Sequence, residues 1–334
     1  MTSPAASAPA RRARVFFALG IGALGALLHY IKFRVMPDHP GDFGLSWFGA
    51  RSLLHGINPY DLVGPGKTYD WPWPLVYPAT AFVAAMPLAV LPQLVAALVF
   101  VFVSCALLAY SVTRDGWQKI PMFGSAAFIV AAGAAQWSPL FTAALGIPII
   151  GLFFAAKPTI GLALGAAGDL RLQKFAVIGG VVLGIVSLLF LPQWPRIWLG
   201  QLKYATEMAP PLVRGGGVFI LLALLRWRRP EARLLVFLAC VPQVGSWYEL
   251  VPVFLVPATY REMMLLVCVS SLGFATQDHI MTARNETEYN QQVGALMVAL
   301  GYLPAVLMVL WRRNEGELPW WLAWVGRAPP PTEE

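Results

Sequence analysis

The first residue that could do chemistry is an aspartate at the boundary of an apolar segment. Asp42 follows the apolar residues 15–34 and lies near the start of a polar, aromatic and proline-punctuated stretch, residues 41–92. A carboxylate at this boundary can meet both lipid headgroups and water, and it can take the proton of a hydroxyl group that acts as a nucleophile. The alternative is a structural role, because aspartate is also a common N-cap of helices. Residue type alone favours the cap, so the surrounding sequence has to decide.

Two further ionisable residues lie within apolar sequence. Lys157 is preceded by phenylalanine and alanine residues and followed by Ile160 and Leu162. Burying a charge in lipid costs about 3 kcal/mol or more, so a lysine at this depth indicates a functional or cavity-facing position. Snorkelling of the side chain to the interface is the alternative. Glu249 begins another apolar run, where it either faces a cavity or caps a helix.

Several cations could hold a phosphate group, because lysine and arginine donate charge-assisted hydrogen bonds to phosphate oxygens. Arg51 follows Asp42 in an expected surface helix, where pairing with a nearby carboxylate or a lipid headgroup is the alternative. The remaining candidates are Lys67, Lys157, Arg196, Lys203 and Arg214.

The histidines do not show the spacing of a metal site. They are His29, His39, His55 and His279, and the sequence contains no HExxH or DxD motif. Asp38 and Asp42 are the nearest approach to a pair of acids. We expect no bound metal, because no spacing typical of metal ligands is present. The three cysteines lie in apolar segments, which predicts that they are packing residues.

The composition indicates that these residues are positioned by a membrane-embedded helical domain. Hydrophobic residues make up 58% of the 334 residues and charged residues 12%, with a mean hydropathy of +0.63, against about a quarter charged in soluble domains. A crossing helix needs about 20 apolar residues, and most of the chain between its first and last arginine clusters meets that requirement. We predict one transmembrane domain, 15–313, between a cytoplasmic tail, 1–14, and a C-terminal tail, 314–334.

The fold class predicted is all-α: a polytopic bundle of about eight to twelve transmembrane or re-entrant helices. Re-entrant or broken helices are expected because prolines interrupt several apolar segments. The first segment is interpreted as an uncleaved anchor, because no small-residue cleavage pattern follows it. The formal charge of +7 comes largely from arginine and lysine beside apolar segments. This pattern indicates membrane topology rather than nucleic-acid binding.

The same charge bias predicts which loops face outward. The basic stretches RLQK, RWRRPEAR and WRRNEGE should lie on the cytoplasmic side. The extended first loop, 36–76, and the stretches 193–211 and 277–289 should then lie outside. The charge bias thus predicts that the first loop faces the external side of the membrane. The expected location is the bacterial cytoplasmic membrane, with the site on the periplasmic side.

The first loop and the helix after it carry a resemblance to a known family. The residues concerned are Asp42-Phe43, Gly49-Ala50-Arg51, Leu53-Leu54, Gly56, Asn58-Pro59-Tyr60-Asp61, Tyr77-Pro78, Pro87-Leu88 and Leu91-Pro92. In order and spacing they resemble the first external loop and second helix of GT-C membrane glycosyltransferases. The resemblance is strongest to glycosyltransferase family 87, whose members use polyprenyl-phosphate-mannose.

Weaker similarity to this family continues downstream. It involves Gln136-Trp137-Ser138-Pro139, the Lys157-Pro158 helix, and Ser246-Trp247-Tyr248-Glu249 before a proline-rich run. In the last of these, Glu249 stands where the resemblance leads us to expect histidine.

The resemblance implies an inverting transfer of a sugar, expected to be mannose, from a polyprenyl-phosphate donor to a hydroxyl of a lipid or glycan acceptor on the external face. Asp42 would be the general base, and no general acid is needed because the leaving phosphate is a weak base. Substrate-binding roles are implied for Arg51, Tyr60, Tyr77, Gln136, Lys157, Trp247 and Glu249.

The expected partners are the lipid-linked donor, the acceptor and membrane lipids, with no cofactor and no nucleic acid; the sequence leaves a protein partner open. The alternative function is a non-catalytic GT-C-like scaffold or a lipid or solute carrier. A transporter would predict paired charges deep in several helices and an inverted repeat, and the sequence shows one deep lysine and no such repeat.

Overall fold

In a computed structural model of this protein, residues 10–36, 41–71, 73–203, 208–316 and 318 are described. Asp38 and His39, considered above as possible metal ligands, lie outside these residues, as does most of both predicted tails. The first helix begins at Arg11, so the described end of the predicted tail 1–14 is already helical.

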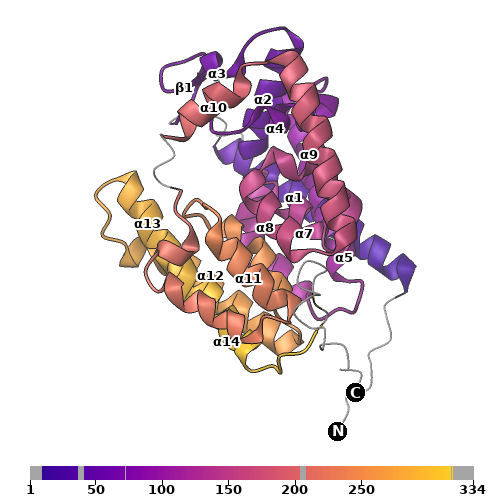
Figure 1. The fold of residues 1–334 in the computed structure, drawn as a ribbon, viewed down its shortest axis with the longest axis vertical. Coiled ribbons are helices and arrows are strands. Elements are labelled where there is room, and N and C mark those ends of the chain that lie inside the picture. The colour runs from indigo at the N-terminus through magenta and orange to yellow at the C-terminus, as the bar shows by residue number, and fades with distance from the viewer. Residues whose placement is uncertain (1–9, 37–40, 72, 204–207, 317, 319–334) are drawn as a thin grey trace, which may run out of the picture.

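Helices dominate the described part of the chain (Figure 1). The α-helices are α1 (Arg11–Val35), α2 (Asp42–Leu54), α3 (Pro59–Leu62), α4 (Ala79–Ala85), α5 (Gln93–Val112), α6 (Ala126–Gly133), α7 (Ser138–Ala143), α8 (Pro158–Ala167), α9 (Leu170–Phe190), α10 (Trp194–Leu202), α11 (Pro230–Cys240), α12 (Tyr260–Ile280), α13 (Glu286–Met297) and α14 (Leu303–Leu310). Between them lie the 3-10 helices η1 (Met86–Leu88), η2 (Ile120–Gly124), η3 (Pro148–Ala156), η4 (Pro211–Val213), η5 (Gly217–Arg226) and η6 (Trp247–Leu255), and the π-helical turn η7 (Val298–Tyr302). The described residues are mostly helical with almost no strands, which agrees with the predicted all-α class.

The strands in the described residues are two residues long each. β1 (Val63–Gly64) pairs in parallel with β2 (Tyr69–Asp70), with Val63 opposite Tyr69. They belong to the predicted first loop, 36–76, which is more structured than its composition suggests. Its helix α2 has a buried face that packs against α4 and α5, with Phe43 stacked on Phe100 at a ring-centroid distance of 4.1 Å.

Five helical stretches in the described chain are long and apolar enough to cross a membrane. They are α1, α5, α9, α12 and the continuous run Thr287–Leu310 that contains most of α13, η7 and α14. Shorter apolar helices span Ala79–Leu88, Pro158–Ala167 and Gly217–Arg226. These helices support the predicted membrane domain, while the predicted total of about eight to twelve crossings or re-entrant segments stays a prediction.

The surface of the long helices agrees with a lipid environment. On α9, Val177, Ile185 and Leu189 expose 66%, 56% and 77% of their surface. Several large aliphatic side chains exposed along one helix would be unfavourable in water, because each leaves apolar area unburied. Lipid removes that cost.

One end of the helical domain is basic and is referred to as the basic end. Here the start of α1 meets the end of α5, because Arg14 donates a hydrogen bond of 2.6 Å to the carbonyl of Tyr110. Lys119, after α5, donates to the carbonyl of Leu255 at the end of η6, at 3.0 Å. These contacts bring the cationic termini of several helices together.

The opposite end is formed by α2, α3 and α10, which lie together at the top of Figure 1, and it is called the loop end below. The indole nitrogen of Trp198 in α10 donates to the carbonyl of Val76 at 2.8 Å, which fixes α10 against the segment before α4. α9 begins at the basic end and runs to this end (Figure 1).

Prolines divide the apolar segments, as expected. The apolar run that Glu249 begins, residues 249–277, is divided between two helices, because η6 ends before Pro257 and α12 starts after it. A capping box starts α12: the Thr259 side chain accepts from the backbone of Glu262, whose carboxylate accepts from the backbone of Thr259. This break separates an inner helix, η6, from the long helix α12.

Candidate active site

A cavity of about 240 Å³ lies between the first turn of α2 and the C-terminal helices. Its walls come from α2, the segment 71–78, the start of α8, α10, the start of η6 and α13. The side chains that matter chemically are Asp42, Tyr77, Lys157, Glu249 and Asn290, and the aromatic ones are Trp71, Trp73, Trp198 and Tyr248. Residues from all parts of the chain therefore converge on one space.

Asp42 is placed by the glycine before it. Gly41 has φ +88°, a conformation that favours glycine, and a Cβ there would lie 2.6 Å from the carbonyl oxygen of Ala134. This close approach lets the Asp42 backbone amide donate to the same carbonyl at 2.9 Å. Gly41 occupies the N-cap position of α2 and Asp42 makes no capping hydrogen bond, so the capping alternative for Asp42 is not what the structure shows.

The carboxylate of Asp42 accepts a hydrogen bond instead from Tyr77, whose Oη lies 3.0 Å from Oδ2. Burial, and after it the charge of Asp42, raises the pKa of Tyr77 well above its ordinary value, so the phenol stays protonated and remains a donor. Tyr60 donates to the backbone carbonyl of Tyr77 at 2.9 Å and lies behind it, away from the cavity. Tyr60 therefore positions Tyr77, and Tyr77 holds Asp42.

Lys157 and Glu249 form a buried ion pair at the cavity wall. Nζ of Lys157 lies 3.2 Å from Oε1 of Glu249, and the two side chains are 13% and 2% exposed. Nζ also lies 3.2 Å from Oε1 of Gln136 and 4.8 Å from the ring centre of Tyr248. Lys157 and Glu249 both face the cavity. Glu249 makes no capping hydrogen bond at the start of η6, whose N-cap residue is Ser246.

One atom of this cluster has no protein partner. Oε2 of Glu249 is buried and accepts no hydrogen bond from the described residues. A buried carboxylate oxygen without a donor is costly. Water or a polar ligand group in the cavity would satisfy it.

Four of the predicted substrate-binding residues are not among the cavity-lining residues. Arg51 is exposed on α2, with its guanidinium 5.3 Å from the ring of Trp47. Gln136 is buried behind Lys157, and Trp247 donates to Gln277 at 2.7 Å. Tyr60, as described, supports Tyr77.

Lys157 is the one predicted phosphate-binding cation that lines this cavity among the described residues. Lys67 donates to the carbonyl of Tyr60 at 2.9 Å, and Arg196 and Lys203 are exposed on and after α10. Arg214 donates to three backbone carbonyls, those of Ala209, Gln243 and Asn290. Its contacts connect η4 with the segments around α11 and α13.

Sequence reasoning did not single out Asn290 or Tyr248 as parts of the site. Tyr248 lies next to Glu249 in η6. The sequence feature that could have identified it is the pair Trp247-Tyr248 before the proline-rich run. Asn290 lies in the polar first half of α13, beside Gln291 and Gln292, so no local signal distinguished it from its neighbours. Three tryptophans, Trp71, Trp73 and Trp198, also line the cavity.

The arrangement offers a proton acceptor, Asp42, and a cation, Lys157, facing one space with aromatic walls. Aromatic rings are suited to stack on the faces of sugar rings, and a cation is suited to a phosphate. No group of three or more histidine, cysteine, aspartate or glutamate residues that could hold a metal ion occurs in the described chain. No family model, no curated protein and no solved structure matches this chain.

Proposed function

We propose that this protein is a membrane glycosyltransferase, which transfers a sugar from a polyprenyl-phosphate donor to a hydroxyl group of a lipid or glycan acceptor. The observation that carries the proposal is the shared cavity of Asp42 and Lys157, a carboxylate and a cation at the loop end of a membrane-embedded helical domain. The resemblance of residues 41–92 to glycosyltransferase family 87 supports it and suggests mannose as the sugar.

Asp42 acts as the general base in this proposal. A sugar hydroxyl is a weak nucleophile at neutral pH, so its proton has to leave as the new bond forms. The acceptor oxygen bonds to the anomeric carbon, its proton passes to Asp42, and the bond from that carbon to the phosphate oxygen breaks with its electrons on the phosphate. Attack opposite the leaving group inverts the anomeric centre. Tyr77 keeps the carboxylate of Asp42 oriented.

Lys157 binds the leaving phosphate. In the cavity without substrate its ammonium group is held between Glu249 and Gln136. Both contacts are 3.2 Å long, near the upper end for an N–H···O hydrogen bond. A phosphate oxygen could therefore replace one of them, because charge-assisted bonds to phosphate are stronger than a bond to a neutral amide. Gln136 would be the displaced partner and Glu249 the competing one.

The external orientation of the cavity is part of the proposal. The loop end carries α10 and the cavity tryptophans Trp71, Trp73 and Trp198. The basic end carries Arg14 and the arginines that follow η5 and α14, so the positive-inside tendency supports a cavity outside the cytoplasm. A lipid-linked donor could then reach the cavity from the outer leaflet.

The test is sugar transfer by the purified protein from radiolabelled polyprenyl-phosphate mannose to acceptors extracted from the membrane. Asp42→Asn should reduce the rate by about 100-fold or more, the range typical of general-base catalysis. The matched control is Asp61→Asn, because Asp61 is an exposed carboxylate of the same loop that does not line the cavity. Transfer at an unchanged rate by Asp42→Asn would contradict the proposal.

The buried Lys157–Glu249 ion pair favours one second candidate, a carrier for a lipid or charged solute, because ion pairs at membrane depth also mark transport pathways. A carrier would move the polyprenyl-phosphate sugar between vesicle leaflets without changing it. In that case Asp42→Asn would still bind and move the polyprenyl-phosphate sugar. The wild type would form no product of sugar transfer.

A further inference from the structure

Two similar tripeptides lie side by side at the basic end. Trp227-Arg228-Arg229 follows η5, and Trp311-Arg312-Arg313 follows α14. Nε of Arg226 donates to the carbonyl of Arg312 at 2.5 Å, and Nε of Arg229 donates to the carbonyl of Arg313 at 2.8 Å. The backbone amide of Arg228 donates to the side chain of Asn314 at 3.0 Å. These bonds hold residues 226–229 against residues 312–314, and this surface is called the double-arginine surface below.

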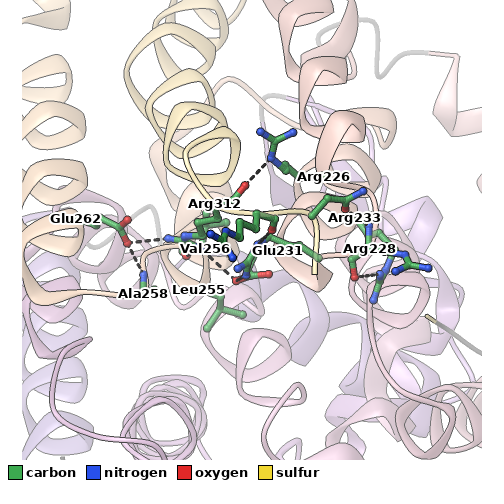
Figure 2. A network of polar contacts seen from close by, with 12 residues as sticks. Arg226, Arg228, Glu231, Arg233, Leu255, Val256, Ala258, Glu262 and Arg312 are labelled. Carbon is green, nitrogen blue, oxygen red and sulfur yellow. Dashed lines mark hydrogen bonds and ion pairs between the residues drawn. The ribbon is translucent and has the colours of Figure 1, made fainter. Parts of the chain in front are cut away.

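Part of the positive charge of this surface is neutralised within the protein, as Figure 2 shows. Arg312 forms ion pairs of 3.1 Å with Glu231 and 2.7 Å with Glu262, and it donates to the carbonyl of Val256. Arg229 lies 3.4 Å from the same carboxylate of Glu231. Arg312 therefore joins α14, α11 and α12, and its charge is used structurally.

Three arginines of the same surface have no ion pair within the described residues. Arg226 donates only to backbone carbonyls, those of Arg312 and Leu225. Arg228 and Arg313 are exposed, and Arg228 lies 5.9 Å from the ring of Trp227. The two exposed guanidinium groups thus remain available to an anion from outside.

Exposed apolar side chains continue directly from these arginines. Leu225 at the end of η5 is 60% exposed, Leu307 in α14 is 54% exposed and Trp311 is 87% exposed. η5 and α14 are packed against each other. A tryptophan between exposed leucines and exposed arginines is typical of the level of the lipid headgroups. The double-arginine surface therefore lies where hydrocarbon gives way to phosphate.

We propose that the double-arginine surface binds the headgroup phosphate of an anionic phospholipid, with the acyl chains along the exposed leucines of η5 and α14. A guanidinium group can give two parallel hydrogen bonds to one phosphate, which lysine cannot do. Basic surfaces between helices at the membrane boundary bind such headgroups. The continuity of arginine with exposed leucine selects a lipid over a nucleic acid or an acidic protein. This inference does not depend on the proposed glycosyl transfer.

The alternative explanation is a diffuse attraction between the basic end and any anionic membrane. The distinction is spatial, because a diffuse field would depend on every cation at this end about equally. Arg171 and Lys174 on α9 are exposed cations of the same end, outside the double-arginine surface. Removing them changes the net charge as much as removing Arg228 and Arg313.

The experiment places the full-length protein in nanodiscs of phosphatidylcholine, with or without phosphatidylglycerol, and measures retained lipid by native mass spectrometry and the melting temperature. The wild type should retain phosphatidylglycerol and melt higher in its presence. Arg228→Gln with Arg313→Gln should weaken retention by roughly tenfold or more, while Arg171→Gln with Lys174→Gln keeps it. Because each protein serves as its own reference in phosphatidylcholine, a general loss of stability cancels.

Equal retention by the Arg228 and Arg313 double variant and the wild type would overturn the proposal. An equal loss in both double variants would overturn it in favour of diffuse attraction. Inorganic phosphate that stabilises the protein in phosphatidylcholine as much as phosphatidylglycerol does would also overturn it, because the ligand would then be a free anion.

Discussion

The buried pair of Lys157 and Glu249 is the residue contact whose function can be tested most sharply. Glu249 competes with any phosphate for the ammonium group, because both are anions and Lys157 is the one cation on the described cavity wall. A substitution that removes the competitor and one that removes the cation should therefore have opposite effects on anion binding.

Glu249→Gln should bind polyprenyl phosphate about tenfold more tightly than the wild type, and Lys157→Gln about tenfold more weakly, since one charge-assisted bond is gained or lost. Binding of fluorescent polyprenyl phosphate to the purified protein measures both. Weaker binding by Glu249→Gln would show that the pair acts as one unit and that Glu249 does not compete.

The same variants need a measurement of stability. Lys157→Gln leaves Glu249 buried without a cation, which costs roughly 3 kcal/mol, whereas the double variant Lys157→Gln with Glu249→Gln removes both charges. The double variant should melt closer to the wild type than Lys157→Gln does. It should still bind polyprenyl phosphate weakly, which separates lost binding from lost folding.

The sequence singled out residues of the cavity better than it predicted their contacts. Asp42, Tyr77, Lys157 and Glu249 were chosen for charge at an apolar boundary or through family resemblance, and all four line the cavity. Arg51 had an equally suitable type but lies on the exposed face of α2. The position of a residue along the helix decides whether it lies on the buried or the exposed face. In α2, polar and apolar residues are mixed on both faces, so the sequence does not tell the two faces apart.

At the scale of elements, the position of Asp42 depends on how α2 begins. The amide of Asp42 and the carbonyl of Ala134 meet only because Gly41 has a left-handed backbone and no Cβ. This contact brings the end of α6 against the start of α2. The position of the proposed base therefore rests on a glycine outside the cavity.

Gly41→Ala should destabilise the protein by roughly 2 kcal/mol, from backbone strain plus the clash with Ala134, and should reduce sugar transfer by shifting Asp42. Gly56→Ala is the matched control, because Gly56 also has a positive φ of 71° but a Cβ added there would meet nothing within 4 Å. Thermal unfolding and the transfer assay measure both variants. If Gly56→Ala costs as much as Gly41→Ala, the close approach at Ala134 is not what matters.

The long apolar elements were predictable and the short ones were not. α1, α5 and α9 follow from length and hydropathy alone. The division of the segment 249–277 into η6 and α12 depends on Pro257 and on the capping box at Thr259, and a continuous apolar run hides that break. η6 matters for the site, because its first turn carries Tyr248 and Glu249.

At the scale of the whole molecule, the charge distribution implies an orientation. The basic end and the loop end are joined by helices that run the length of the domain. The positive-inside tendency assigns the basic end to the cytoplasm. The catalytic proposal needs the cavity on the other side. Orientation is therefore a prediction that can be tested separately from activity.

Single cysteines in a background without Cys105, Cys240 and Cys268 test this orientation. Asp61→Cys, at the loop end, should react with a membrane-impermeant maleimide added to intact cells. Arg171→Cys, at the basic end, should react only after the membrane is opened. Both positions are exposed in the described chain. Labelling of Arg171→Cys in intact cells, with Asp61→Cys protected, would reverse the assignment.

The convergence of distant segments is what sequence alone could not supply. Asn290 and Asp42 face one cavity although most of the chain separates them. The two tryptophan–arginine–arginine segments meet in the same way through backbone carbonyls, which leave no signature in residue type. Such contacts follow from the packing of whole helices.

The central claim is that Asp42 takes a proton during sugar transfer and is not required to hold the donor. The most direct measurement is donor binding and transfer on one preparation of Asp42→Asn, beside Asp61→Asn and the wild type. The predicted result is donor binding within about threefold of the wild type and a transfer rate lower by about 100-fold or more. Two results would contradict this role of Asp42. One is transfer at the wild-type rate by Asp42→Asn. The other is that none of the three proteins forms a product with mannose or any other sugar donor.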